Sequence, residues 1–234
     1  MCVTGAGSLA ITFRLFAERR IVRLTKLSES QKRSLNEAVS RYHASLKGSP
    51  AEEYLARRGL PDSLVDQHRL GFVEDPLPEH EHLRGRLAIP YLRKHPSLGW
   101  STVSIRFRAL DDSKPKYKSL SGDRPRLYNA NVLTFDTPEV GIAEGEIDAL
   151  SATHAGLPTV GVPGANAWQP HFAPLFEGYR TVYLFTDGDE AGEKLAASVS
   201  KELGNVKVIP FPEGEDVNSV LVSQGVEQLQ RLWQ

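Results

Sequence analysis

Four short apolar runs alternate with helix-like segments in the carboxyl-terminal part of the chain. In order they read EVGIAEG then EIDALSATHAG, LPTVGVPGA then NAWQPHFAPLFEG, YRTVYLFTDGD then EAGEKLAASVSKELG, and NVKVIPFPEGED then VNSVLVSQG. Short strands that alternate with helices of roughly 10–15 residues form a parallel sheet flanked by helices. We therefore predict an α/β fold for residues 137–234, with a domain boundary at Thr137-Pro138.

The residues before this boundary have a different pattern. Residues 28–46 and 49–60 show helical spacing of apolar side chains, and a third short helix is predicted to start at Pro61. Residues 86–92 and 99–110 are strand-like, whereas residues 111–129 are polar, basic and loop-rich. This pattern predicts a smaller, mixed α+β basic subdomain over residues 28–136. Residues 1–27 form an N-terminal extension of unknown role.

The charge is divided unevenly between the two halves. The formal net charge is −1, but residues 1–135 carry 23 Lys and Arg against 14 Asp and Glu, and residues 136–234 carry 5 against 15. Such asymmetry suggests a basic surface for a polyanion beside an acidic site that requires cations. Two domains with an accidental charge bias would give the same numbers, so this observation needs support from motifs.

Composition excludes several classes of protein. The single cysteine, Cys2, rules out an intramolecular disulfide and a cysteine-based zinc ribbon within this chain, so no zinc is expected. The apolar runs fall short of the ~20 residues needed to cross a bilayer. The N-terminus has no basic residue ahead of its apolar stretch, which argues against a signal peptide. We expect a cytoplasmic protein with no membrane contact.

Acidic residues follow three of the predicted strands. Glu144 and Asp148 follow the first, Asp187 and Asp189 follow the third, and Asp216 follows the fourth. Because parallel strands end at one edge of their sheet, these side chains should meet there. Two carboxylates ~4 Å apart repel by about 4 kcal/mol at an effective dielectric near 20, and Mg²⁺ or Mn²⁺ would relieve that repulsion. Any single one of these residues could instead be a helix cap.

A glycine-rich stretch, VGVPGANA (160–167), opens the second predicted helix. Its backbone N–H groups could hold a phosphate, although an ordinary tight turn is equally consistent. The stretch lacks a Lys-Ser/Thr pair after its glycines, so it is not a P-loop.

The order EGEIDAL, Gly-Val-Pro-Gly, LFTDGDEAG and GEDVN, over about residues 138–222, resembles the Toprim domain of primases, topoisomerases and some nucleases. By this resemblance Glu144 takes the acid–base position and Asp148, Asp187, Asp189 and Asp216 take metal-ligand positions. Asn218 stands where bacterial primases usually have a second Asp, which is more similar to phage primase-helicases. The predicted metal ligands are therefore Glu144, Asp148, Asp187, Asp189, Asp216 and Asn218, of which the first four are also the predicted catalytic residues.

Upstream, YLARRGL, RLGFV, RLAIPYL and SIRFRALDDSKPKYKSL resemble, in order, the amino-terminal half of the bacterial-type (DnaG-like) primase core. The resemblance implies that basic residues of this segment hold nucleotide triphosphate or template, and Tyr117 and Tyr128 would be available for stacking on bases. The candidate nucleotide- or DNA-binding residues are Arg86, Arg108, Lys116 and Tyr117, with Arg106, Lys118, Arg124 and Arg126 as weaker candidates.

These resemblances imply a compact phage primase core that lacks a zinc ribbon. Such a core would make short RNA primers from ribonucleoside triphosphates on single-stranded DNA in the host cytoplasm, with Mg²⁺ or Mn²⁺. A replicative helicase or a separate zinc-ribbon subunit could be its partner. A Toprim-type nuclease and a non-catalytic DNA-binding accessory module of the replisome remain alternatives. A topoisomerase is not expected, because the sequence shows no second region to house a catalytic tyrosine and a gate.

Overall fold

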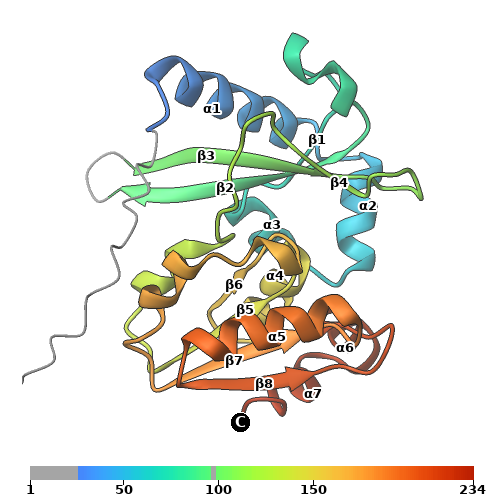
Figure 1. Ribbon diagram of the computed structural model, residues 1–234. Coiled ribbons are helices and arrows are strands. Elements are labelled where there is room, and N and C mark those ends of the chain that lie inside the picture. Colours follow the sequence, from blue (N-terminus) through green and yellow to red (C-terminus); the bar gives the residue numbers. More distant parts are fainter. Residues whose placement is uncertain (1–25, 96–98) are drawn as a thin grey trace, which may run out of the picture.

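The computed structural model describes residues 26–95 and 99–234, which form two four-stranded sheets. In Figure 1 the first sheet lies in the upper half of the view and the second in the lower half. The expected N-terminal extension lies outside the described residues, apart from Lys26 and Leu27. None of the helices within the described ranges is long and apolar enough to cross a membrane.

The first sheet is antiparallel with the order β1-β2-β3-β4. Helix α1 (Glu29–Ala44) begins with a capping box at Ser28 and buries Leu35, Val39 and Tyr42 against one face of this sheet. Helices α2 and α3 follow α1 in the chain. The bounds are α2 (Pro50–Arg57), α3 (Asp62–Gln67), β1 (Gly71–Phe72), β2 (Leu87–His95), β3 (Gly99–Arg108) and β4 (Tyr117–Ser119), with a 3₁₀ helix η1 (Pro78–Leu83) before β2.

The second sheet is parallel with the order β6-β5-β7-β8, so the predicted parallel α/β arrangement is confirmed. Its strands are short apolar runs buried on both faces, apart from the edge strand β8, as expected when helices cover a parallel sheet. The bounds are β5 (Glu139–Ala143), α4 (Glu146–His154), β6 (Thr159–Gly161), β7 (Thr181–Thr186), α5 (Glu190–Glu202), β8 (Val206–Pro210), α6 (Val217–Gln224) and α7 (Val226–Gln230).

One hydrophobic cluster joins the two sheets. Leu87, Ile89 and Tyr91 of β2 belong to the same buried cluster as Ile147 and Leu150 of α4. The face of the first sheet opposite α1 therefore packs on the helices of the second sheet. The predicted division of the chain at residue 136 stays a prediction, since the core runs across it.

Two local predictions differ from the structure. The segment 166–178 was expected to be one helix. It contains most of the short 3₁₀ helix η3 (Ala165–Ala167) and all of a second, η4 (Pro170–Leu175). Pro170 and Pro174 explain the difference, because proline lacks the N–H that a continuing α-helix needs. The segment 111–129, expected to be a loop, contains the three-residue strand β4, which pairs with the end of β3.

Candidate functional site

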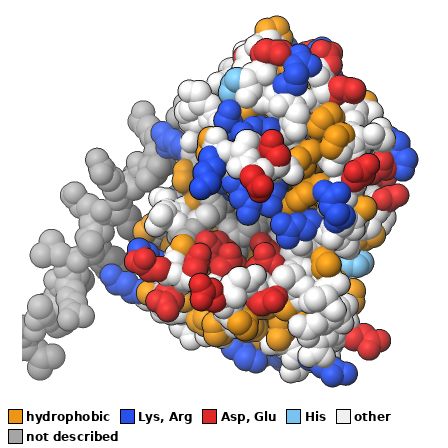
Figure 2. Space-filling view, turned by 90° about the vertical axis from the view of Figure 1, so that its right-hand side faces the viewer, with side chains coloured by type: hydrophobic (Ala, Val, Ile, Leu, Met, Phe, Trp, Pro, Cys, Tyr) orange, Lys and Arg blue, Asp and Glu red, His pale blue; other side chains and the backbone are white. Residues whose placement is uncertain are grey.

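A polar pocket of about 180 Å³ lies where the end of the parallel sheet faces β3 and β4. Acidic residues from the second sheet's loops form one side and basic residues from the first sheet form the other. Figure 2 shows the same division on this face of the molecule, with Lys and Arg gathered above a band of Asp and Glu. Eight of the predicted site residues line this pocket, namely Glu144, Asp148, Asp187, Asp216, Arg106, Arg108, Lys116 and Tyr117.

Three strand ends deliver the carboxylates. Glu144 follows β5 directly, and Asp148 lies in the first turn of α4. Asp187 follows β7, and Asp216 precedes α6. Their convergence reflects the parallel topology, which brings the carboxyl ends of β5, β7 and β8 to one edge.

The carboxylates interact strongly enough to change their protonation. Burial, then the charges of Asp216 and Asp187, raise the pKa of Asp148 to about 7. Burial, then Asp216 and Asp189, raise the pKa of Asp187 to about 6. Each shift records an unfavourable negative charge held among others. Hard oxygen donors that repel one another in this way fit a hard divalent cation such as Mg²⁺ or Mn²⁺.

Two of the acids cap helices, as the alternative interpretation has it, and their metal-ligand roles stay predictions. Asp189 caps α5 by accepting from the Gly192 N–H at 2.8 Å, and it does not line the pocket. Asp216 caps α6 by accepting from the Ser219 N–H at 2.6 Å, yet it also lines the pocket. Over the described part of the chain, no group of three or more His, Cys, Asp or Glu side chains is placed so that it could hold a metal ion without rearrangement.

Asn218 is buried and fully engaged in hydrogen bonds. Its side-chain oxygen accepts from Arg58 at 2.8 Å, and its side-chain nitrogen donates to the Arg58 carbonyl and the Ser151 hydroxyl, both at 2.8 Å. Its backbone N–H donates to Asp148 at 3.1 Å. The metal-ligand role of Asn218 stays a prediction, and these contacts favour a bridge that positions Asp148 and Arg58.

The glycine-rich loop reaches the pocket through Gly164, whose φ is 103°. The Gly164 N–H donates to the carbonyls of Glu144 and Val162. That donor is therefore used within the turn, as the tight-turn interpretation requires, and is not directed at a ligand.

The basic side of the pocket is formed by β3 and by the start of β4. Arg108 is buried at the end of β3, and Lys116 immediately precedes β4. Burial and the neighbouring Arg108 and Arg58 lower the pKa of Lys116, whereas Asp216 and Asp148 oppose that shift. Arg86 lies behind this edge and donates to the Pro115 carbonyl at 3.1 Å, so it supports the segment that carries Lys116.

Arginines and tyrosines alternate around the pocket. The Arg106 guanidinium lies 4.5 Å from the Tyr117 ring centre, and Arg108 lies 5.1 Å from the same ring. Tyr54 is likewise contacted by Arg108 at 5.1 Å and by Arg58 at 5.3 Å. We call this set, in spatial order Arg106, Tyr117, Arg108, Tyr54 and Arg58, the arginine–tyrosine stack. Both rings are thus in contact with guanidinium groups of the chain itself.

Sequence reasoning missed Arg58 and Tyr54, and it also missed Glu146. Arg58 lines the pocket from the end of α2, and Glu146 lines it from the first turn of α4. The signals were present, since YLARRGL and EGEIDAL were already selected as motifs and contain these three residues. Periodicity alone could not show that residues 58 and 146 face the same pocket.

The remaining basic candidates lie away from the carboxylates. Lys118 donates to the His82 carbonyl at 3.3 Å. Arg124 and Arg126 line a neighbouring pocket, which Arg106 also lines. Arg126 lies 3.4 Å from Asp123. Their roles in DNA contact stay predictions.

The expected role of Tyr128 in base stacking is wrong. Its side chain is buried, and its hydroxyl lies 3.2 Å from His68 Nδ1. Its ring meets Tyr91 edge-on at 5.2 Å inside the core.

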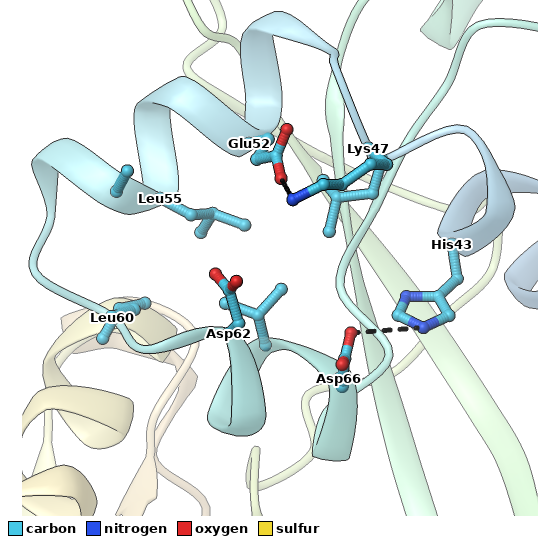
Figure 3. Close-up of a pocket in the computed structure, with 10 residues that line it drawn as sticks. His43, Lys47, Glu52, Leu55, Leu60, Asp62 and Asp66 are labelled. Atoms are coloured by element: carbon cyan, nitrogen blue, oxygen red, sulfur yellow. Dashed lines mark ion pairs between the residues drawn. The ribbon is translucent and has the colours of Figure 1, made fainter.

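A separate pocket of about 160 Å³ lies among α1, α2 and α3 (Figure 3). Lys47 pairs with Glu52 at 2.6 Å and His43 lies 3.8 Å from Asp66 at its margin, with Leu55 among its apolar lining. It contains none of the predicted site residues.

Comparisons with known proteins agree with this geometry. A family model described as Toprim-like matches residues 141–221, the span that carries the four strand ends. The Gene 57 protein of Mycobacterium phage D29 is 56% identical over 62% of this chain and 96% of its own length. The DNA primase of Pseudomonas aeruginosa is 26% identical over 82% of this chain.

The chain spans about a third of that primase, 36% of its length. Among solved structures, the DnaG primase catalytic domain bound to ssDNA superposes with a TM-score of 0.67 at 21% identity, covering 86% of this chain and 79% of that chain. At this identity the likeness supports the fold.

Proposed function

Because the chain belongs to the family of bacterial-type (DnaG-like) primase catalytic cores with a Toprim domain, we propose that it catalyses primer synthesis. It would join ribonucleoside triphosphates into short RNA primers on single-stranded DNA, as a metal-dependent nucleotidyltransferase of DNA replication.

One observation carries this proposal. Carboxylates from three strand ends face Arg108 and Lys116 across a single pocket. Acids alone would suit any metal-dependent chemistry on phosphates. A lysine and a buried arginine opposite them add a place for the triphosphate, which a hydrolytic nuclease does not need.

The residues of the chain would divide the work between binding and proton transfer. Asp148, Asp187 and Asp216 would hold Mg²⁺ or Mn²⁺, which would lower the pKa of the attacking hydroxyl and stabilise charge on the phosphoryl oxygens. Arg108 and Lys116 would orient the triphosphate by charge-assisted hydrogen bonds. Glu144, half-buried beside them, would accept the proton of the attacking hydroxyl.

The template and the partners follow by analogy. One solved structure of similar fold is that of the DnaG primase catalytic domain bound to ssDNA. Single-stranded DNA is therefore the first template to supply. A zinc-ribbon subunit or a replicative helicase would act in trans, in the cytoplasm of the host if the chain is phage-encoded.

Primer synthesis by the purified chain tests the proposal. The assay contains single-stranded DNA, ribonucleoside triphosphates and either Mg²⁺ or Mn²⁺, with and without a supplied zinc-ribbon subunit. Asp187→Asn should lower the rate by about 10²–10³-fold, because it removes a charge on which transition-state stabilisation depends. Glu227→Gln, which changes an exposed carboxylate on α7, should leave the rate unchanged.

Two further measurements with the same variants separate the alternatives. Nicking of DNA without nucleotides, lost in Asp187→Asn, would identify a Toprim-type nuclease. If Asp187→Asn and Glu144→Ala both support replication as well as the unaltered chain does, the accessory-module alternative is correct.

A further inference from the structure

Glu146 is a buried acid that no predicted role accounts for. It is the first residue of α4 and is 1% exposed. A carboxylate removed from water needs compensation by opposite charge and hydrogen bonds. Its partners therefore indicate what it does.

Both partners come from the other sheet. Glu146 Oε1 accepts from the Arg106 guanidinium at 2.6 Å and from the Tyr91 hydroxyl at 2.7 Å. Arg106 lies on β3 and Tyr91 on β2, so the contact crosses from the parallel sheet's first helix to the antiparallel sheet. Glu146 thereby fixes one basic side chain relative to the carboxylate edge.

Arg106 in turn contacts Tyr117, which contacts Arg108. The Arg106 guanidinium lies over Tyr117 at 4.5 Å, and the Tyr117 hydroxyl is hydrogen-bonded to Arg108. Glu146 therefore stands at one end of the arginine–tyrosine stack. At the other end, Arg58 contacts Asn218, which contacts Asp148 on the same helix as Glu146. Helix α4 thus holds both ends of the stack.

Charge explains why one end needs an acid. Arg58, Arg106, Arg108 and Lys116 line one small pocket, and like charges at such distances repel. Glu146 neutralises Arg106 locally. Arg106 can then serve as the support for Tyr117, and the charges of Arg108 and Lys116 remain available for phosphate.

We propose that Glu146 is a positioning residue, which acts through Arg106 and Tyr117 to set Arg108 for the triphosphate. The inference rests on the proposed function and goes beyond it, because that function assigns Glu146 no contact with metal or nucleotide.

The test is Glu146→Gln, which keeps the shape of the side chain and removes its charge. We expect the KM for ribonucleoside triphosphates to rise about tenfold while kcat changes less than about threefold, as for loss of ground-state positioning. Triphosphate affinity measured without template should fall by the same factor. Mn²⁺ affinity measured without nucleotide should stay within about twofold of the unaltered chain, because none of the proposed metal ligands is changed.

Two controls isolate the mechanism. Glu37→Gln breaks an exposed Glu–Arg pair, Arg41–Glu37 at 3.1 Å, and should change neither affinity. In an Arg106→Gln background, Glu146→Gln should have no further effect on KM, because the effects of residues that act through one contact are not additive.

Glu146→Asp keeps the charge, and its KM for ribonucleoside triphosphates should lie between that of the unaltered chain and that of Glu146→Gln. It also serves as the test variant if Glu146→Gln does not fold.

Each opposing result has a distinct meaning. Unchanged triphosphate affinity in a folded Glu146→Gln protein overturns this inference and leaves the proposed function standing. Lost Mn²⁺ affinity would make Glu146 a metal ligand, and additive effects with Arg106→Gln would show that it acts elsewhere. An unaltered chain that binds no triphosphate overturns both proposals.

Discussion

At the residue scale, Asn218 tests whether a side chain near the proposed metal site is a ligand or a support. Asn218→Ala leaves Arg58, its carbonyl and Ser151 without their buried partner, so the free energy of unfolding should fall by about 2–4 kcal/mol. Thermal melting measures this loss. Mn²⁺ affinity should change little if the side chain is a support.

Asn205→Ala is the matched control, since Asn205 donates to the carbonyls of Phe176 and Tyr179 far from the pocket. It should lower stability without any change in metal binding. A large loss of Mn²⁺ affinity in Asn218→Ala with an unchanged melting temperature would restore Asn218 as a ligand.

At the element scale, the start of α5 sets the position of Asp187. A Cβ on Gly192 would lie 2.2 Å from the Asp187 carbonyl oxygen, so the helix reaches the end of β7 only because residue 192 has no side chain. Gly192→Ala should push the two apart, with a cost of about 1–3 kcal/mol and at least about a tenfold loss of Mn²⁺ affinity. Isothermal titration and melting curves give both values.

Gly204→Ala provides the comparison, because a Cβ there would meet nothing within 4 Å. It should leave folding and metal affinity near those of the unaltered chain. Equal Mn²⁺ affinity in the two variants would mean that the contact between α5 and β7 does not position Asp187.

The elements also show what the sequence could and could not reveal. Alternating apolar runs were enough to predict the parallel sheet, and topology then brought Asp148, Asp187 and Asp216 together. The three-residue strand β4 has no pattern of its own and exists because β3 offers it an edge. Tyr128 looked available for stacking because its partners, His68 and Tyr91, are distant in sequence.

At the scale of the whole molecule, the crowded acids should make stability depend on pH. The folded pKa of Asp148 is about 7 against an ordinary 3.8, so the folded state binds this proton more tightly than the unfolded state does. Stability from this group is therefore present at low pH and is lost as pH rises toward and through 7. His68, whose pKa is lowered to about 4, has the opposite effect below its ordinary 6.5.

The informative window is therefore about pH 6.5 to 8, where the folded state releases the Asp148 proton and the opposing effect of His68 fades. Without divalent metal, the free energy of unfolding should fall by roughly 0.5 kcal/mol across it, or about 1–2 °C in melting temperature. Millimolar Mg²⁺ should reverse the loss, because a cation binds the deprotonated acids. Asp148→Asn should abolish most of the slope, and a slope that persists in this variant would place its origin elsewhere.

The hydrophobic cluster shared by β2 and α4 has a consequence for motion. Enzymes with an active site between two lobes often close by a hinge when the interface between the lobes is small and polar. Here a hinge would expose Leu87, Ile89 and Tyr91 on one side and Ile147 and Leu150 on the other. The entrance of the pocket between the two sheets should therefore be open and nearly fixed in width. Substrates should be selected by their fit to this entrance, without closure of one lobe on the other.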